Sequence, residues 1–380
     1  MSASSFSNHM LISRRNVLRH IVTGAVTAAL PSLVEGAGKT GGPIRLSRNE
    51  NAYGPSAKVK AAMQEAALNV ANRYPDVEAE ALRLKIAAHH GVAPEQVVLG
   101  CGSSEIMRMA VDAFAGYRKK LILAKPTFDS IRGFAERAGA EVIAVPLARD
   151  HSHDLGAMLA RADDTTGLVY ICNPNNPTGT LTCREDIEAF VRSLPPTTSV
   201  LIDEAYHHYV SQSADYASFI DRPLDDNRVI VTRSFSKIFG LAGLRVGYAV
   251  ATPQAARRLA SYQLPDEVNV VAASAAIAAL DDTEHVLASA RRNADERQEF
   301  FNQANARMVR AIDSHTNFVM LGTAGPAIEV IEHFRKNDIA LPPPIPLFDE
   351  HIRVSVGTAA DMLEFWRVWD LMPGHQMSHE

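Results

Sequence analysis

Residues 167–205 read GLVYICNPNNPTGTLTCREDIEAFVRSLPPTTSVLIDEA, and this stretch decides the fold. An apolar run rich in β-forming residues, GLVYICN, leads through a polar turn to the amphipathic segment DIEAFVRSL and then to a second apolar run, SVLIDEA. Buried strands that alternate with helical segments favour parallel pairing, with the helices as right-handed crossover connections. The stretch therefore predicts two strands of a mostly parallel α/β sheet.

The same alternation continues on both sides, from about residue 95 to about residue 250, through the runs VVLG, LILA, EVIAVPL, RVIVTRS and RVGYAV. Beyond it, long alanine-rich helical segments precede the runs NFVMLG and HIRVSVG, which favour a smaller α+β unit. We predict an α/β fold with a large domain, built on a mostly parallel seven-stranded sheet flanked by helices, and a smaller α+β domain. The predicted boundaries are an N-terminal arm at 38–60, the large domain at 61–260, the small domain at 261–373 and a tail at 374–380.

The composition argues against several classes of protein. The 380 residues are 47% hydrophobic and carry a net charge of −5, whereas binding to nucleic acid needs a concentrated basic face. Cys101, Cys172 and Cys183 are too few for a disulfide framework and lack CxxC spacing. The histidines lack the i, i+4 spacing with a glutamate that marks a metalloprotease. We therefore expect no nucleic-acid partner and no metal site.

The N-terminus has the order of a signal peptide. Arg14 and Arg15 precede the mildly apolar run IVTGAVTAAL at residues 21–30, which small residues follow. The paired arginines favour the twin-arginine type, so residues 1–37 are predicted to direct export to the periplasm. The alternative is a frayed basic terminus with a short helix on a cytoplasmic protein. The run is too short to span a bilayer as a mature helix, and we expect no membrane span in the mature protein.

One lysine stands in an unusual environment. Residues 234–248 read SFSKIFGLAGLRVGY, in which Phe235, Ile238, Phe239 and Leu241 surround Lys237. If the segment is buried, its ammonium group is partly desolvated and its pKa falls. A lysine of this kind is a nucleophile towards carbonyl compounds.

Three polar turns follow predicted strands, at the sheet edge where α/β proteins bind ligands. Gly102, Ser103 and Ser104 follow VVLG, the turn Asn173–Gly179 follows GLVYIC, and Asp203 ends SVLID. A glycine turn, a rigid structural turn and a helix cap would explain each one separately. Together they suit one ligand. Lys237 would react with an aldehyde, the serines at a helix N-terminus would bind a phosphate, and Asp203 would pair with a cationic ring nitrogen. Pyridoxal phosphate has all three features.

With these motifs, the sequence resembles the fold-type I pyridoxal-phosphate-dependent aminotransferases of class I/II, and most closely their histidinol-phosphate aminotransferase-like branch. The resemblance spans residues 46–358, nearly the whole mature chain, and any one motif alone would be unspecific. The motifs that carry it, in family order, are LSRNENAYGPS, NRYPD, LGCGSSEI, KPTF, NPNNPTG, DEAY, SFSKIFGLAGLRVGY and HIRVSVGT.

The resemblance implies a role for each cofactor-binding residue. Lys237 would bond covalently to the cofactor and then shuttle a proton as general base and acid. Asp203 would keep the pyridine nitrogen protonated, and Asn176 and Tyr206 would donate hydrogen bonds to the phenolic oxygen of the cofactor. Phe128 would stack on the ring, unless it is an ordinary core residue. The residues expected around the phosphate are Ser103, Ser104, Ser234, Ser236 and Arg245.

The resemblance also implies contacts with the substrate and with a second subunit. Arg353 would pair with the substrate α-carboxylate. Asn49, Tyr53 and Asn317 would line the substrate side of the pocket. Tyr74 would reach the phosphate of a neighbouring subunit, which makes a homodimer the expected assembly. The expected substrates are an L-amino acid and a 2-oxo acid, exchanged by an amino-group transfer.

The chain departs from the family at one point. Histidinol-phosphate enzymes usually carry an arginine shortly before the carboxylate arginine, and this chain has Pro342 there, within the segment NDIALPPP. The phosphate of histidinol phosphate would lose a charge-assisted partner, worth about 1.5–3 kcal/mol, so an amino acid is predicted as substrate in its place.

Two other kinds of function stay open. A decarboxylase or oxidase of the same fold would release carbon dioxide or consume oxygen. A non-catalytic binding or regulatory protein would show visible absorbance without amino-acid turnover, although it would have no need of Lys237, Asp203 and Arg353 together.

Overall fold

The computed structural model describes residues 42–211, 213–224 and 226–372. The described residues all belong to one compact unit. The predicted signal peptide and the tail at 374–380 lie outside the described residues, and the predicted boundary at residue 260 stays a prediction. Within the described ranges, the helices are too short or too polar to cross a membrane.

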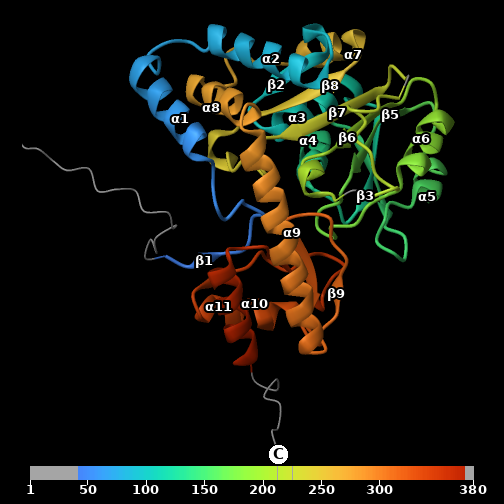
Figure 1. The fold of residues 1–380 in the computed structure, drawn as a ribbon. Coiled ribbons are helices and arrows are strands. Elements are labelled where there is room, and N and C mark those ends of the chain that lie inside the picture. The colour runs from blue at the N-terminus through green and yellow to red at the C-terminus, as the bar shows by residue number, and fades with distance from the viewer. Residues whose placement is uncertain (1–41, 212, 225, 373–380) are drawn as a thin grey trace, which may run out of the picture. The chain divides into compact units, whose positions relative to one another are not determined.

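The central sheet has seven strands, and most of them are parallel, as predicted (Figure 1). The exception is β8, which runs antiparallel to both of its neighbours. Parallel neighbours need a crossover connection, usually a helix, whereas the 235–246 connection into β8 holds only the short 3₁₀ helix η3 (Ala242–Leu244). The order across the sheet is β2 (Val97–Gly100), β8 (Gly247–Ala251), β7 (Val229–Ser234), β6 (Ser199–Asp203), β5 (Thr166–Cys172), β3 (Lys120–Lys125) and β4 (Glu141–Pro146).

Both faces of this sheet are covered by helices because its strands are apolar on both sides. Along β5, Leu168 and Tyr170 join one core cluster, whereas Val169 and Ile171 join the other. The first cluster includes α3 (Ser103–Phe114), α4 (Ser130–Arg137) and α7 (Pro253–Ala260). The second includes α1 (Ala57–Asn69), α2 (Asp76–His90), α5 (Leu155–Leu159), α6 (Arg184–Ser193) and α8 (Val270–Leu280), with the 3₁₀ helix η2 (His207–Tyr209). The 3₁₀ helix η1 (Pro94–Gln96) leads into β2.

A smaller antiparallel sheet has the order β12 (His351–Ser355), β10 (Phe318–Gly322), β9 (Ala311–Ile312). A two-stranded parallel pair joins β1 (Ile44–Arg45), near the N-terminal end, to β11 (Ile339–Ala340). The third core cluster contains Phe300, Phe334, Phe365 and Trp369. These aromatic residues come from α9 (Thr283–Ala306), α10 (Ala327–Lys336) and α11 (Ala359–Asp370).

Candidate active site

The carboxyl ends of β5, β6 and β7 border a cavity of about 1060 Å³. Cys172, Asp203 and Ser234, the last residues of these strands, all line it. The first turn of α3 adds Ser103 and Ser104 to the walls, and the strand β12 adds Arg353. The cavity brings together most of the site residues predicted from the sequence, namely Asn49, Ser103, Ser104, Phe128, Asn176, Asp203, Tyr206, Ser234, Ser236, Lys237, Arg245 and Arg353.

Lys237 lies in the turn that follows β7, between the buried side chains of Phe235 and Ile238. Its Nζ donates hydrogen bonds to the carbonyl oxygens of Asn49 (3.1 Å) and Arg48 (3.3 Å). Burial of the ammonium group, reinforced by the positive charge of Arg353, lowers the pKa of Lys237 to about 8. A lysine with this pKa carries a useful fraction of free amine near neutral pH, so it can attack an aldehyde.

Asp203 ends β6 and is buried. One carboxylate oxygen accepts a hydrogen bond from the Tyr170 hydroxyl (2.8 Å), and the other accepts one from the Ala205 N–H (3.0 Å). Burial raises the pKa of Asp203 to about 6, although the Tyr170 hydrogen bond opposes the shift. This carboxylate makes no ion pair with any residue in the described ranges, so a cationic ring nitrogen would supply the missing partner.

An anion cradle lies where α3 begins. Its N-terminal cap is Gly102, at φ 76°, and no side chain caps the helix. A Cβ on Gly102 would lie 2.3 Å from Nη2 of Arg245, so the guanidinium group packs directly on this glycine. Nη1 of Arg245 donates to Ser236 Oγ (3.4 Å), and the Ser236 N–H donates to Ser234 Oγ (3.0 Å). Helix N–H groups, hydroxyls and a guanidinium around one point fit a phosphate group.

One amide connects the remaining polar groups. Asn176 donates through Nδ2 to the Tyr206 hydroxyl (3.4 Å), which also accepts a hydrogen bond from Asn49 Nδ2 (3.1 Å). The Oδ1 atom of Asn176 accepts a 2.6 Å hydrogen bond from Arg353 Nη1. Nη2 of Arg353 donates to the Ser47 carbonyl (2.9 Å), whereas its buried Nε has no partner in the part of the chain that the structure describes. An arginine with a buried, unused donor is suited to a carboxylate ligand.

Three predicted site residues do not line this cavity. Asn317 lies behind it and donates to the carbonyls of Asn49 (3.1 Å) and Glu50 (3.2 Å), so it supports the cavity wall rather than forming it. Tyr53 lines a separate small pocket, where Arg292 stacks on its ring. Tyr74 is 79% exposed. Its predicted contact with a second subunit stays a prediction.

Sequence reasoning did not identify Tyr170 or the segment around Ile345 as parts of the site. Tyr170 lies inside β5, and its hydroxyl reaches the Asp203 carboxylate. A buried tyrosine usually finds a hydrogen-bond partner, which was the available signal, but the sequence does not name that partner. Ile345 and Pro346 line the cavity from a loop that has no distinctive motif.

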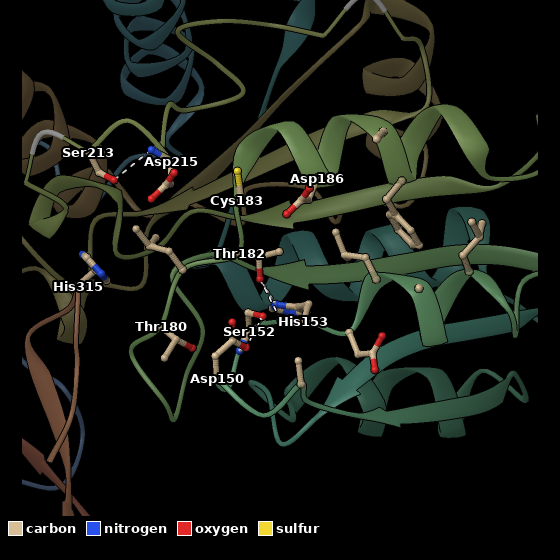
Figure 2. A pocket seen from close by; sticks show the side chains of 18 of the residues that line it. Asp150, Ser152, His153, Thr180, Thr182, Cys183, Asp186, Ser213, Asp215 and His315 are labelled. Atoms are coloured by element: carbon tan, nitrogen blue, oxygen red, sulfur yellow. Dashed lines mark hydrogen bonds between the residues drawn. The ribbon is translucent and has the colours of Figure 1, made fainter. Parts of the chain in front are cut away.

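A second large cavity, of about 950 Å³, is lined by Asp150, His153, Thr182, Asp186 and His315, among others (Figure 2). No lysine or arginine lines it. It therefore offers neither an amine nucleophile nor a cationic partner for a phosphate or carboxylate. The described residues also contain no group of three or more histidine, cysteine or acidic side chains placed to hold a metal ion.

Comparisons with known proteins agree with this geometry. The family described as aminotransferase class I and II matches residues 42–368. A histidinol-phosphate aminotransferase of Caldicellulosiruptor saccharolyticus is 35% identical over 85% of this chain and 89% of that protein. An aromatic amino acid aminotransferase of Rhodococcus jostii is 37% identical over 84% of this chain and 87% of that protein.

Among solved structures, the histidinol-phosphate aminotransferase of Sinorhizobium meliloti, in complex with pyridoxal 5′-phosphate, superposes with a TM-score of 0.80 and 27% identity. The match covers 87% of this chain and 92% of that one. Lys237, Asp203 and the cradle around Arg245 fit the aldehyde, the ring nitrogen and the phosphate of the same cofactor. This chain belongs to the aminotransferase class I and II family, with pyridoxal 5′-phosphate as its cofactor.

Proposed function

We propose that this protein is an exported, homodimeric aminotransferase that transfers the amino group of an L-amino acid, rather than that of histidinol phosphate, to a 2-oxo acid. The observation that carries the proposal is the convergence of a lysine whose pKa is about 8, a buried carboxylate without an ion-pair partner and an arginine with an unused donor, all in one cavity.

Pyridoxal phosphate, when bound, supplies an aldehyde that condenses with amines and a ring that accepts the electron pair left on the substrate Cα. The Lys237 amine, once free of the cofactor, would take the proton from the substrate Cα and donate it to the carbon that carried the aldehyde, so that the amino group stays with the cofactor. Asp203 keeps the positive charge on the ring nitrogen, since a buried carboxylate stabilises a nearby cation. Arg353 orients the substrate by its carboxylate. Asn176 holds Arg353 in place through one hydrogen bond and Tyr206, on the cofactor side of the cavity, through another.

A substrate other than histidinol phosphate is supported by the segment that contains Pro342. The arginine that would meet the phosphate of histidinol phosphate is absent from this segment. The similarity to an aromatic amino acid aminotransferase, at 37% identity, is as high as that to the histidinol-phosphate enzymes. Relatives of comparable similarity are thus named for different substrates.

Two features support the homodimer and the export. Exposed apolar side chains gather in and after α1, where Leu68 is 85%, Tyr74 79% and Val77 75% exposed, and such patches commonly form protein interfaces. The pair Arg14 and Arg15 before an apolar run supports the twin-arginine route, by which an enzyme crosses the membrane folded with its cofactor.

The experiment follows the visible absorbance of the purified holoenzyme while single L-amino acids are added. A yellow band that bleaches with particular amino acids, and returns with a 2-oxo acid, is the expected result. Lys237→Ala should lose both the characteristic band and turnover, while its thermal unfolding shows that the fold is intact. Normal turnover in Lys237→Ala would contradict the proposal, as would release of carbon dioxide or consumption of oxygen in place of amino transfer.

A further inference from the structure

The loop between β11 and β12 forms part of the cavity wall. Hydrogen bonds from Ile44 N to Asp338 O (2.8 Å) and from Leu46 N to Ala340 O (3.0 Å) attach the start of this loop to the N-terminal segment. At its other end Phe348 is buried, and its N–H donates to the Ile345 carbonyl (3.0 Å). The loop is therefore held at both ends, with Ile345 and Pro346 in the cavity wall between them.

This wall is next in the chain to the strand that carries Arg353, the residue proposed to bind the substrate carboxylate. The loop leads directly into β12, which carries Arg353, and Arg353 Nη2 donates to the carbonyl of Ser47, next to Leu46. The phosphate cradle belongs to other segments, the turn at Gly102 and the loop of Arg245. A substrate held by its carboxylate at Arg353 and by its amino group near Lys237 therefore has the Ile345–Pro346 wall within reach of its side chain.

The charged groups of the cavity are mostly engaged. Arg132 forms an ion pair with Asp129 through Nε (2.7 Å), and Glu50 forms one with Arg45 (2.6 Å). Arg48 and Lys125 make no ion pair with any other described residue, but both side chains are exposed. An exposed cation gains little from an ion pair because water already solvates it. Apart from Lys237 and Arg353, the described residues that line the cavity provide no buried cation for an anionic side chain.

We propose that the side chain of the amino-acid substrate is uncharged and apolar, and that Ile345 and Pro346 select it by packing against it. The proposal rests on the proposed function, because it names the substrate class of the same cavity. An apolar wall favours an aliphatic or aromatic group and leaves a carboxylate or phosphate without a partner.

The test compares kcat/KM of the holoenzyme for L-leucine and L-phenylalanine with that for L-aspartate and L-glutamate. The apolar substrates should be preferred by about tenfold or more. Ile345→Arg should shift the ratio of anionic to apolar substrates by about tenfold or more towards the anionic ones, since it adds a charge-assisted partner to the wall. The matched control is Leu347→Arg, which adds the same charge to the same loop at a side chain that is 63% exposed and outside the cavity wall. It should leave the ratio unchanged.

A binding measurement supplements the kinetics. The unreactive carboxylates 3-phenylpropanoate and succinate perturb the visible band when they bind. The apolar 3-phenylpropanoate should bind more tightly than succinate, and Ile345→Arg should reduce this difference in affinity. If Ile345→Arg does not fold, Ile345→Lys replaces it with the same expectation, because the Ile345 side chain is only partly exposed.

The proposal is overturned if the unaltered enzyme prefers the dicarboxylic substrates, or if a charged variant of Ile345 folds and leaves the ratio of kcat/KM between anionic and apolar substrates unchanged. In either case amino acids would still bleach the band, and the aminotransferase function would stand. If no amino acid bleaches the band, the proposed function itself fails, which is a distinguishable result.

Discussion

Arg353 and Asn176, 177 positions apart in the chain, are joined by a hydrogen bond of 2.6 Å between Nη1 and Oδ1. The amide nitrogen of Asn176 in turn donates to the Tyr206 hydroxyl at 3.4 Å. One amide therefore connects the arginine suited to the substrate carboxylate with a tyrosine whose ring lies 5.4 Å from Lys237 Nζ. One partly buried hydrogen-bond network therefore connects the residue proposed to bind the substrate with a residue proposed to contact the cofactor.

Arg353→Ala should raise KM for the preferred L-amino acid by about tenfold or more, because a charge-assisted hydrogen bond to the carboxylate is lost. Arg353→Lys should recover only part of the loss, since an ammonium group cannot form the paired contact. Steady-state kinetics with the amino acid and with the corresponding amine, which lacks the carboxylate, provide the measurement. Equal effects of Arg353→Ala on both compounds would show that this arginine does not bind the carboxylate.

The pKa of Lys237, which burial lowers to about 8, makes cofactor capture depend on pH. Only the neutral amine attacks the aldehyde, so the rate at which the apoprotein forms its visible band should rise with pH and be half-maximal at about pH 8. Removal of the Arg353 charge favours the protonated lysine, so Arg353→Ala should move the midpoint to higher pH, and Arg353→Lys should leave it near the original value. The same midpoint pH in Arg353→Ala as in the unaltered protein would contradict this coupling.

The same shift predicts how apoprotein stability changes with pH. The folded-state pKa of Lys237 is below its ordinary value of 10.5, so the unfolded chain binds more protons between about pH 8 and 10.5. The contribution of this group to the free energy of unfolding should therefore rise with pH across that window. Denaturant unfolding of the apoprotein, compared with that of Lys237→Met, isolates the contribution, and an identical pH slope in the two proteins would refute it.

Gly102→Ala should weaken cofactor binding by about tenfold or more, because its Cβ would displace Arg245 from the phosphate cradle. Gly91→Ala is the matched control, since Gly91 has a similar positive φ of 64° but open space around its missing Cβ. Equilibrium titration of both apoproteins with pyridoxal phosphate separates loss of the cradle from backbone strain. Similar losses of affinity in both variants would mean that strain alone is responsible.

Tyr170→Phe should raise the pKa of Asp203 further, because the Tyr170 hydrogen bond is the main interaction that lowers it. A carboxylate that is protonated more readily holds the cationic ring nitrogen less well, so cofactor affinity should fall, and more steeply at mildly acidic pH. Tyr209→Phe is the control, because Tyr209 is a buried tyrosine that lies outside the cavity wall. A pH-independent loss in Tyr170→Phe would argue for a packing effect.

Replacement of Arg14 and Arg15 by lysines should retain the protein in the cytoplasm, as expected of a twin-arginine signal. Cell fractionation followed by immunoblotting measures the distribution. Unchanged export would contradict the twin-arginine signal and would favour the alternative of a frayed basic terminus.

The sequence by itself determined the α/β fold, the strand-end positions of Asp203 and Ser234, and the family. These follow from local patterns, because alternating apolar runs and amphipathic segments form strands and helices wherever they are buried, and parallel strands bring their carboxyl ends to one sheet edge. The environment of Lys237 was also visible, since its apolar neighbours are adjacent in the chain.

Only the tertiary structure decided the direction of β8, the partner of Tyr170, the placement of Tyr53 and Asn317 outside the cavity, and the contribution of Ile345 and Pro346 to its wall. Each depends on contacts between segments far apart in the chain, as in the bond from Arg353 to Asn176. The value of the Lys237 pKa depends on such contacts too, because the cost of burying a charge is set by everything packed around it. Local pattern specifies which groups are present, and packing specifies which of them meet.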